Sequence, residues 1–179
     1  MNAFTIGIVC RGNTCRSPVM GVWVRELAGR AQVNSAMQVW TAGMCIGDKD
    51  VDKKVPPIAQ EMGLSKQLVD ELKKHEAHDL TEEHRNTDLL VWITDPDRAN
   101  EIENGVSLAE RMRGEAKRLG AVLLIIPEPD RPWEAMDRGA PDEEVEQLYR
   151  EQAVSLRNWA SIIHAFVPRN PQTDRRRNG

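Results

Sequence analysis

Residues 8–18 read IVCRGNTCRSP, and this stretch decides the fold because it joins an apolar, strand-like run to the start of a helix. We expect the strand to end at Cys10 and the helix to begin at Ser17, placed as N-cap before Pro18 at the first helical position. A short loop that closes onto a helix N-terminus aims backbone N–H groups at one point and adds the positive end of the helix dipole. The stretch therefore predicts a cradle for a dianion.

The residue types in this loop suit phosphate chemistry. Gly12 allows a positive φ, and Asn13 tolerates the same conformation. Arg16 offers a planar fork of donors for two phosphate oxygens. Cys10 lies where the local field is expected to lower the pKa of its thiol, and the Ser17 hydroxyl can donate to its sulfur. The predicted phosphate-binding residues are Arg11, Gly12, Asn13, Thr14, Cys15, Arg16 and Ser17.

Cys10 and Arg16 together predict phosphoryl transfer. A thiolate below a bound phosphate, with an arginine spanning the equatorial oxygens, can accept the phosphoryl group in line. The predicted reaction is phosphomonoester hydrolysis through a cysteinyl-phosphate, and it needs no metal or cofactor. A buried cysteine that merely ends an apolar strand is the plain alternative. The spacing of cysteine, five residues, arginine and serine favours the catalytic interpretation.

Around this stretch, strand and helix patterns alternate. Four short apolar runs indicate strands at residues 4–9, 38–42, 89–94 and 121–126. Helical patterns follow the loop to Gly29 and occupy residues 56–63, 82–86, 97–103 and 108–119, and a long amphipathic helix runs from Pro141 to Pro168. Nearly continuous apolar strands are typical of a parallel sheet buried on both faces. We therefore expect an α/β fold whose ligand site lies where the strands end.

Composition limits the class of protein. The chain has 179 residues, a net charge of -4 and no apolar run long enough to cross a bilayer. These values predict one domain over residues 1–168 with a disordered tail over 169–179, and they argue against nucleic-acid and membrane partners. The N-terminus lacks a signal-peptide pattern, so we expect a cytoplasmic protein. Three cysteines are too few for a disulfide scaffold, and the sequence carries no signal for an oligomeric state.

The stretch CRGNTCRSP resembles the signature of the low-molecular-weight protein tyrosine phosphatase family, in which the nucleophile directly follows the first strand. The resemblance covers most of residues 4–167. It implies a phosphotyrosine protein phosphatase I-like fold, a three-layer sandwich whose central four-stranded parallel sheet is flanked by helices on both faces. It also implies a phosphorylated protein or a small aryl phosphate as substrate.

Two further segments resemble elements that support the loop in that family. Thr41-Ala42-Gly43 looks like its Ser-Ala-Gly element, which places a hydroxyl at Thr41 against the phosphate loop. His75-Glu76-Ala77 resembles its His-x-Ala segment, whose imidazole ties to the loop asparagine, here Asn13. In this family the second loop cysteine, here Cys15, can form a reversible disulfide with the nucleophile. The alternative is a small residue that merely fits the loop, and Cys45 is expected to be a rim or buried residue.

The general acid of the family is an aspartate in an Asp-Pro-aromatic loop after the fourth strand, and here the chain departs from the pattern. Residues 127–133 read PEPDRPW. Alignment on Pro129 makes Glu128 the first choice for the acid, and a small shift of the loop promotes Asp130 instead. Trp133 could supply the missing aromatic wall. The Asp95-Pro96 pair, which also reads Asp-Pro, is expected to cap a helix after the third strand.

Two other functions compete with phosphatase activity. Arsenate mimics phosphate, so the same loop would suit an arsenate reductase, but that chemistry needs further cysteines beside the third strand, and residues 75–95 contain none. A slow or non-catalytic phosphate-binding relative is the other alternative, because the acid loop is altered. Cys10, Arg16 and Ser17 all remain in place and favour the enzyme.

Overall fold

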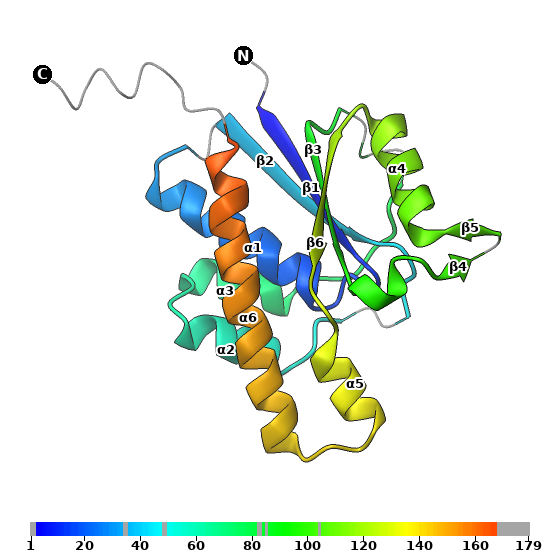
Figure 1. The fold of residues 1–179 in the computed structure, drawn as a ribbon. Helices are drawn as coiled ribbons and strands as arrows, with labels where there is room; N and C mark the ends of the chain where they lie inside the picture. Colours follow the sequence, from blue (N-terminus) through cyan, green and yellow to red (C-terminus); the bar gives the residue numbers. More distant parts are fainter. Residues whose placement is uncertain are drawn as a thin grey trace, which may run out of the picture.

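The computed structural model describes residues 3–33, 36–47, 50–81, 84, 86–103 and 105–167. Its centre is a parallel four-stranded sheet in the order β2-β1-β3-β6 (Figure 1). Each strand lies within one residue of the run that predicted it, so the predicted sheet is confirmed. The strands are β1 (Phe4–Cys10), β2 (Met37–Gly43), β3 (Leu89–Thr94) and β6 (Val122–Pro127).

Helices cover both faces of the sheet, which confirms the three-layer sandwich. α1 (Arg16–Arg30) packs against α6 (Asp142–Ala165) on one face, and α5 (Arg131–Asp137) packs against α6 (Figure 1). α4 (Leu108–Leu119) covers the other face. No helix within the described ranges is long and apolar enough to span a membrane. The remaining elements are α2 (Val55–Glu61), α3 (Lys66–Lys73), the 3-10 turn η3 (Pro96–Arg98) and the hairpin of β4 (Ile102–Glu103) and β5 (Val106–Ser107).

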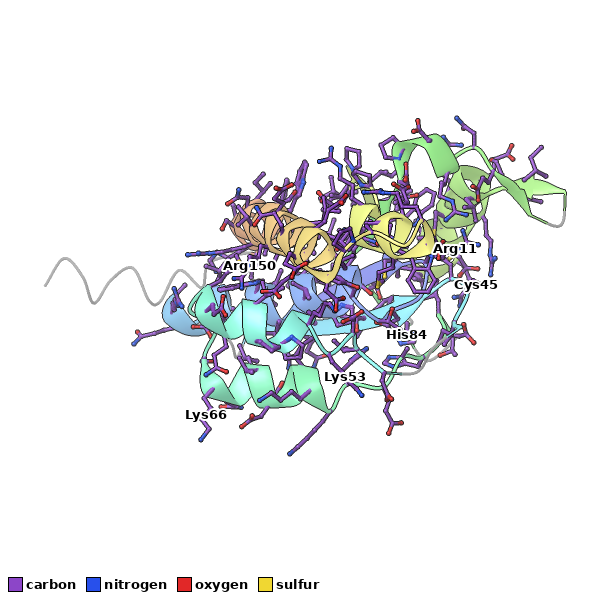
Figure 2. All side chains as sticks on the ribbon, turned by 90° about the horizontal axis from the view of Figure 1, so that it is seen from below. Arg11, Cys45, Lys53, Lys66, His84 and Arg150 are labelled. Carbon is purple, nitrogen blue, oxygen red and sulfur yellow. The ribbon has the colours of Figure 1, made fainter. Side chains whose placement is uncertain are left out.

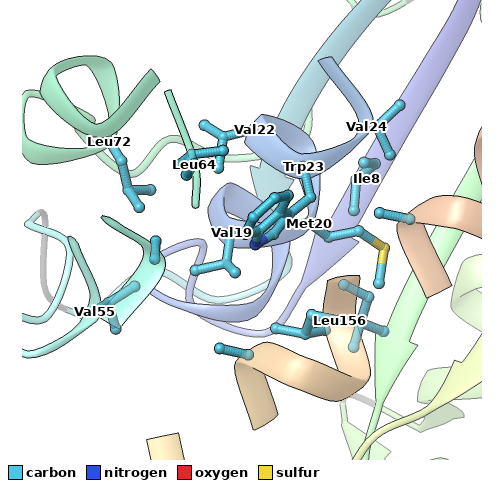
Figure 3. Packing of buried hydrophobic residues seen from close by; sticks show 14 of the residues in the cluster. Ile8, Val19, Met20, Val22, Trp23, Val24, Val55, Leu64, Leu72 and Leu156 are labelled. Atoms are coloured by element: carbon cyan, nitrogen blue, oxygen red, sulfur yellow. The ribbon is translucent and has the colours of Figure 1, made fainter. Parts of the chain in front are cut away.

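The two faces of the sheet bury separate clusters because side chains alternate along each strand. Ile8 and Cys10 of β1 belong to the cluster that also holds Trp23 of α1 and Leu156 of α6 (Figure 3). Val9, between them, belongs to the cluster under α4. Cys10 is therefore only 2% exposed, at the point where β1 leaves the sheet.

The start of α1 differs from the sequence prediction. The helix begins at Arg16 with Cys15 as its N-cap residue, and no side chain caps it. Ser17 is not the N-cap, because its hydroxyl is used inside the preceding loop. The helix expected over residues 56–63 is present as α2, and α3, which follows it, was not predicted.

The segment after β3 also differs. Residues 97–103 were expected to be helical, but the helix is limited to η3 because the chain then turns into a hairpin in which Ile102 pairs with Ser107. Asp95 does cap η3, since its carboxylate accepts a hydrogen bond from the N–H of Asp97 at 2.9 Å. α5 was not predicted, and α6 ends at Ala165 rather than Pro168. The predicted tail over 169–179 and most of the predicted helix over 82–86 lie outside the described residues.

Candidate active site

The loop between β1 and α1 curls around the sulfur of Cys10. The backbone N–H of Asn13 donates to Cys10 Sγ at 3.3 Å, and Ser17 Oγ lies 3.0 Å from the same sulfur. Asn13 takes the predicted positive φ, 54°, which turns the loop back toward the cysteine. The N–H groups of Gly12, Thr14 and Cys15 have no acceptor among the described residues. The loop thus presents unpaired donors around one thiol, as an anion cradle requires.

Ser17 links the state of the thiol to the rest of the loop. Its hydroxyl has one hydrogen and two possible acceptors, Asn13 Oδ1 at 3.1 Å and Cys10 Sγ at 3.0 Å. When Cys10 is a thiol, the S–H can donate to Ser17 Oγ while that hydroxyl donates to Asn13. When Cys10 is a thiolate, the Ser17 hydroxyl can instead donate its hydrogen to the sulfur. Ser17 can therefore stabilise the charged nucleophile without moving.

Asn13 is fully buried and fixes the loop to the neighbouring elements. Its amide nitrogen lies 3.4 Å from the backbone oxygen of Thr41 and 3.3 Å from that of His78. Nε2 of His75 lies 3.1 Å from Asn13 O and 3.2 Å from Oδ1, so the contact expected between imidazole and asparagine is present. Both partners are acceptors, which assigns the ring hydrogen to Nε2. Burial lowers the pKa of His75, so the ring is neutral at neutral pH.

The support from β2 comes from backbone atoms rather than from the Thr41 hydroxyl. The family resemblance implied a hydroxyl contact at Thr41, but among the described residues it is the carbonyl of Thr41 that accepts from the Asn13 amide. Gly43 has a role that could not be recognised from the sequence. A Cβ at this position would lie 3.0 Å from Arg11 O, and the N–H groups of Met44 and Cys45 both donate to that same oxygen. The glycine of the Thr-Ala-Gly element lets β2 approach the loop closely.

The side chain of Arg16 is held by two residues of the segment that follows β6. Its Nη1 donates to the backbone oxygen of Glu128 at 3.0 Å, and its Nη2 lies 2.8 Å from Asp130 Oδ2. The side chain of Arg16 is only 6% exposed. Its Nε has no acceptor in the described part of the chain, so one edge of the guanidinium still offers donors to an anion.

The two candidate acids face different surroundings. The Glu128 carboxylate accepts a hydrogen bond of 2.5 Å from Ser155 Oγ on α6, and burial raises its pKa. Asp130 instead faces Arg16 and lines the pocket beside the loop. The side chain of Glu128, the residue before Pro129, thus points to α6, whereas that of Asp130 lies at the pocket.

The pocket at the mouth of the loop is bounded by residues from several elements. Arg11 and Cys45 lie close together on this side of the molecule (Figure 2). Trp92 is its sole aromatic lining residue within the described chain, and Trp92 is buried. Trp133 does not line the pocket and is half-exposed on α5, so the aromatic wall suggested by the sequence is not formed there. The lining residues are Arg11, Arg16, Met44, Cys45, Trp92, Ile93, Thr94, Asp95, Arg98, Leu108 and Asp130.

Comparison with known proteins identifies a family for the part of the chain that contains the Cys10 loop. The family model described as "Low molecular weight phosphotyrosine protein phosphatase" matches residues 5–123, which include the Cys10 loop but end before Glu128 and Asp130. No curated protein matches the chain. Among solved structures, 54 chains match.

Three of these structures show how far the fold is shared. A low molecular weight phosphotyrosine phosphatase from Vibrio cholerae O395 has 18% identity and a TM-score of 0.63, and the alignment covers 90% of this chain and 94% of that one. The YwlE arginine phosphatase from Geobacillus stearothermophilus has 17% identity and a TM-score of 0.61, with 98% and 97% covered. An arsenate reductase in the phosphate binding state has 11% identity and a TM-score of 0.58, with 92% and 99% covered. At these identities the likeness shows the fold alone.

Proposed function

The chain belongs to the low molecular weight phosphotyrosine protein phosphatase family, and from this we propose that it hydrolyses phosphomonoesters through a cysteinyl-phosphate on Cys10. The observation that carries the proposal is the position of the sulfur. Cys10 Sγ lies inside a loop of unpaired N–H groups, within 3.0 Å of the Ser17 hydroxyl. A cytoplasmic setting is part of the proposal, because reducing conditions keep such a thiol free.

The proposed reaction has two steps. In the first, Cys10 Sγ forms a bond to phosphorus while the bond to the leaving oxygen breaks, and Asp130 in its acid form protonates that oxygen. In the second, a water oxygen attacks phosphorus, the sulfur–phosphorus bond breaks, and the Asp130 carboxylate takes the water proton. Arg16 and the loop N–H groups stabilise the charge on the phosphoryl oxygens in both steps.

Asp130 is our choice for the acid because, of the two candidate carboxylates after β6, it is the one that lines the pocket. Its Oδ2 already lies 2.8 Å from Arg16 Nη2, so it stands beside the guanidinium that would hold the phosphoryl group. Glu128 is turned toward Ser155 and contributes its backbone oxygen to Arg16 instead. Geometry comes before pKa in assigning a general acid, so the nearer carboxylate is preferred.

The proposal is tested by comparing two activities of the purified full chain. We expect turnover of p-nitrophenyl phosphate and no arsenate-dependent consumption of thiols. Arsenate-dependent thiol consumption without phosphatase turnover would instead identify an arsenate reductase. Phosphate binding without either activity would identify a phosphate-binding relative that has lost catalysis.

We further expect the rim of the pocket to favour substrates with acidic residues beside the phosphorylated one. Arg11 lies 3.8 Å from Glu101, whereas Arg98 holds the same carboxylate at 2.7 Å, so Arg11 is the more weakly held guanidinium at the pocket. Phosphotyrosine peptides with acidic flanks should have a KM several-fold lower than peptides with neutral flanks. The reason is that an exposed ion pair contributes ~0.2–1 kcal/mol to the free energy of binding. Arg11→Ala should remove this difference.

Kinetics on matched peptides give the measurement, and p-nitrophenyl phosphate is the control because it has no flanking residues. Arg113, which does not line the pocket, offers a matched control variant, Arg113→Ala. A phosphoarginine peptide belongs in the same panel, since one solved neighbour is described as an arginine phosphatase. Equal KM values for acidic and neutral flanks in the unaltered protein would refute the preference.

Peroxide should inactivate the protein reversibly through a bond between Cys10 and Cys15. Peroxide oxidises the Cys10 thiolate to a sulfenic acid, and the Cys15 thiol then displaces water to form the disulfide. Burial raises the pKa of Cys15 well above its ordinary value, so Cys10 is expected to be oxidised first. After peroxide and then a thiol reductant, the unaltered protein should regain activity, whereas Cys15→Ser should remain largely inactive. Equal recovery of the two proteins would rule out the disulfide.

A further inference from the structure

We propose that Gln152 of α6 is a positioning residue that sets the orientation of Asp130 by tying the segment after β6 to the Cys10 loop. Gln152 was predicted only as part of the amphipathic pattern of the last helix. It is polar and yet only 4% exposed. This inference rests on the proposed role of Asp130 as the general acid.

Gln152 forms a bridge between the two loops of the site. Its Nε2 donates to the backbone oxygen of Pro129 at 3.0 Å, and its Oε1 accepts a hydrogen bond from Cys15 Sγ at 3.3 Å. The Pro129 oxygen can only accept, so the NH₂ side of the amide must face it and Oε1 must face the cysteine. Cys15 must then be the protonated thiol, in keeping with its burial. Both the NH₂ group and the oxygen of the buried Gln152 amide therefore have a hydrogen-bond partner in the site.

The bridge acts on the peptide units that lead to Asp130. Two successive carbonyls are each fixed by a different partner, that of Glu128 by Arg16 Nη1 and that of Pro129 by Gln152 Nε2. One turn further along α6, Ser155 holds the Glu128 carboxylate. With both carbonyls held, the backbone before Asp130 has little freedom to rotate, and its carboxylate is kept on the pocket side.

Loss of this bridge should therefore weaken proton transfer more than binding of the phosphoryl group. The phosphoryl group is held by the loop N–H groups and Arg16, which keep their own contacts. A displacement of the acid by about 1 Å can cost on the order of 10²-fold in rate when proton transfer matters. Leaving groups that need no proton should not be affected to the same degree.

The test is Gln152→Met, which keeps the length of the side chain and removes both hydrogen bonds. We expect kcat for phenyl phosphate, a poor leaving group, to fall about tenfold or more, and kcat for p-nitrophenyl phosphate to change less than about threefold. Gln147→Met is the matched control, because Gln147 is exposed on the same helix and Glu151 is the one partner of its amide among the described residues. It should leave both rates unchanged.

A double-mutant cycle with Asp130→Asn shows whether Gln152 acts through the acid. Gln152→Met should have no further effect on phenyl phosphate in the Asp130→Asn background. An equal loss on both substrates, no loss on either, or the same loss in the Asp130→Asn background would overturn the inference. Asp130→Asn with Gln152 intact tests the acid assignment by itself, so the two failures are distinguishable. If Gln152→Met does not fold by circular dichroism, Gln152→Leu, which also removes both hydrogen bonds, replaces it with the same expectation.

Discussion

Replacement of Cys10 by serine is expected to reduce hydrolysis of p-nitrophenyl phosphate to background while phosphate binding stays close to that of the unaltered protein. A serine hydroxyl is a far weaker nucleophile at neutral pH than a thiolate, and no base stands beside Cys10 to activate it; its described polar neighbours are the Ser17 hydroxyl and the Asn13 N–H. The anion cradle is made of backbone N–H groups and Arg16, which the substitution does not touch. Steady-state kinetics and calorimetric titration with inorganic phosphate provide the two measurements.

Cys45→Ser is the matched control for this prediction. Cys45 is an exposed thiol that lines the same pocket, and its backbone N–H, not its sulfur, bonds to Arg11 O. The control should therefore keep its activity. If Cys10→Ser retained more than a trace of turnover, the cysteinyl-phosphate mechanism would have to be abandoned. If it lost phosphate binding as well, the sulfur would be part of the anion site rather than only its nucleophile.

The phosphate loop could be predicted from sequence because its parts are close together in the chain. Cys10 and Ser17 are seven positions apart, and a strand followed by a tight turn and a helix leaves few ways to arrange them. The strands were predicted for a similar reason, since continuous apolar runs fit a sheet covered on both faces. The start of α1 was misplaced because the Ser17 hydroxyl could either cap the helix or bond inside the loop. In the structure it bonds inside the loop, to Cys10 Sγ and Asn13 Oδ1.

The choice between Glu128 and Asp130 depends on contacts that no local pattern contains. Glu128 meets Ser155, 27 positions later, and Asp130 meets Arg16, far earlier in the chain. Which carboxylate enters the pocket is set by how Ser155 of α6 and Arg16 of α1 meet the segment after β6, and sequence spacing around Pro129 carries no information on those contacts. The role of Gly43 is similar, since only the approach of β2 to the loop shows why a Cβ would not fit.

Asp130→Asn should slow hydrolysis of phenyl phosphate or phosphotyrosine by roughly 10²- to 10⁴-fold, the range typical of a lost general acid. The effect on p-nitrophenyl phosphate should be much smaller, because its leaving group departs without a proton. An acid works only while protonated, so the rate for a poor leaving group should fall with rising pH, and Asp130→Asn should flatten that basic limb. Rates over a series of leaving groups and over pH provide the measurement.

Glu128→Gln is the matched control, and it separates the two assignments. Glu128 is half-buried against Ser155 with a raised pKa, and a glutamine has the same shape as its protonated form, so we expect small changes in rate. If Glu128→Gln shows the leaving-group pattern and Asp130→Asn does not, the segment after β6 must rearrange when substrate binds. If neither substitution matters although phosphate still binds, no carboxylate in this segment donates the proton. A slow phosphate-binding protein would then explain the intact loop better than an efficient phosphatase.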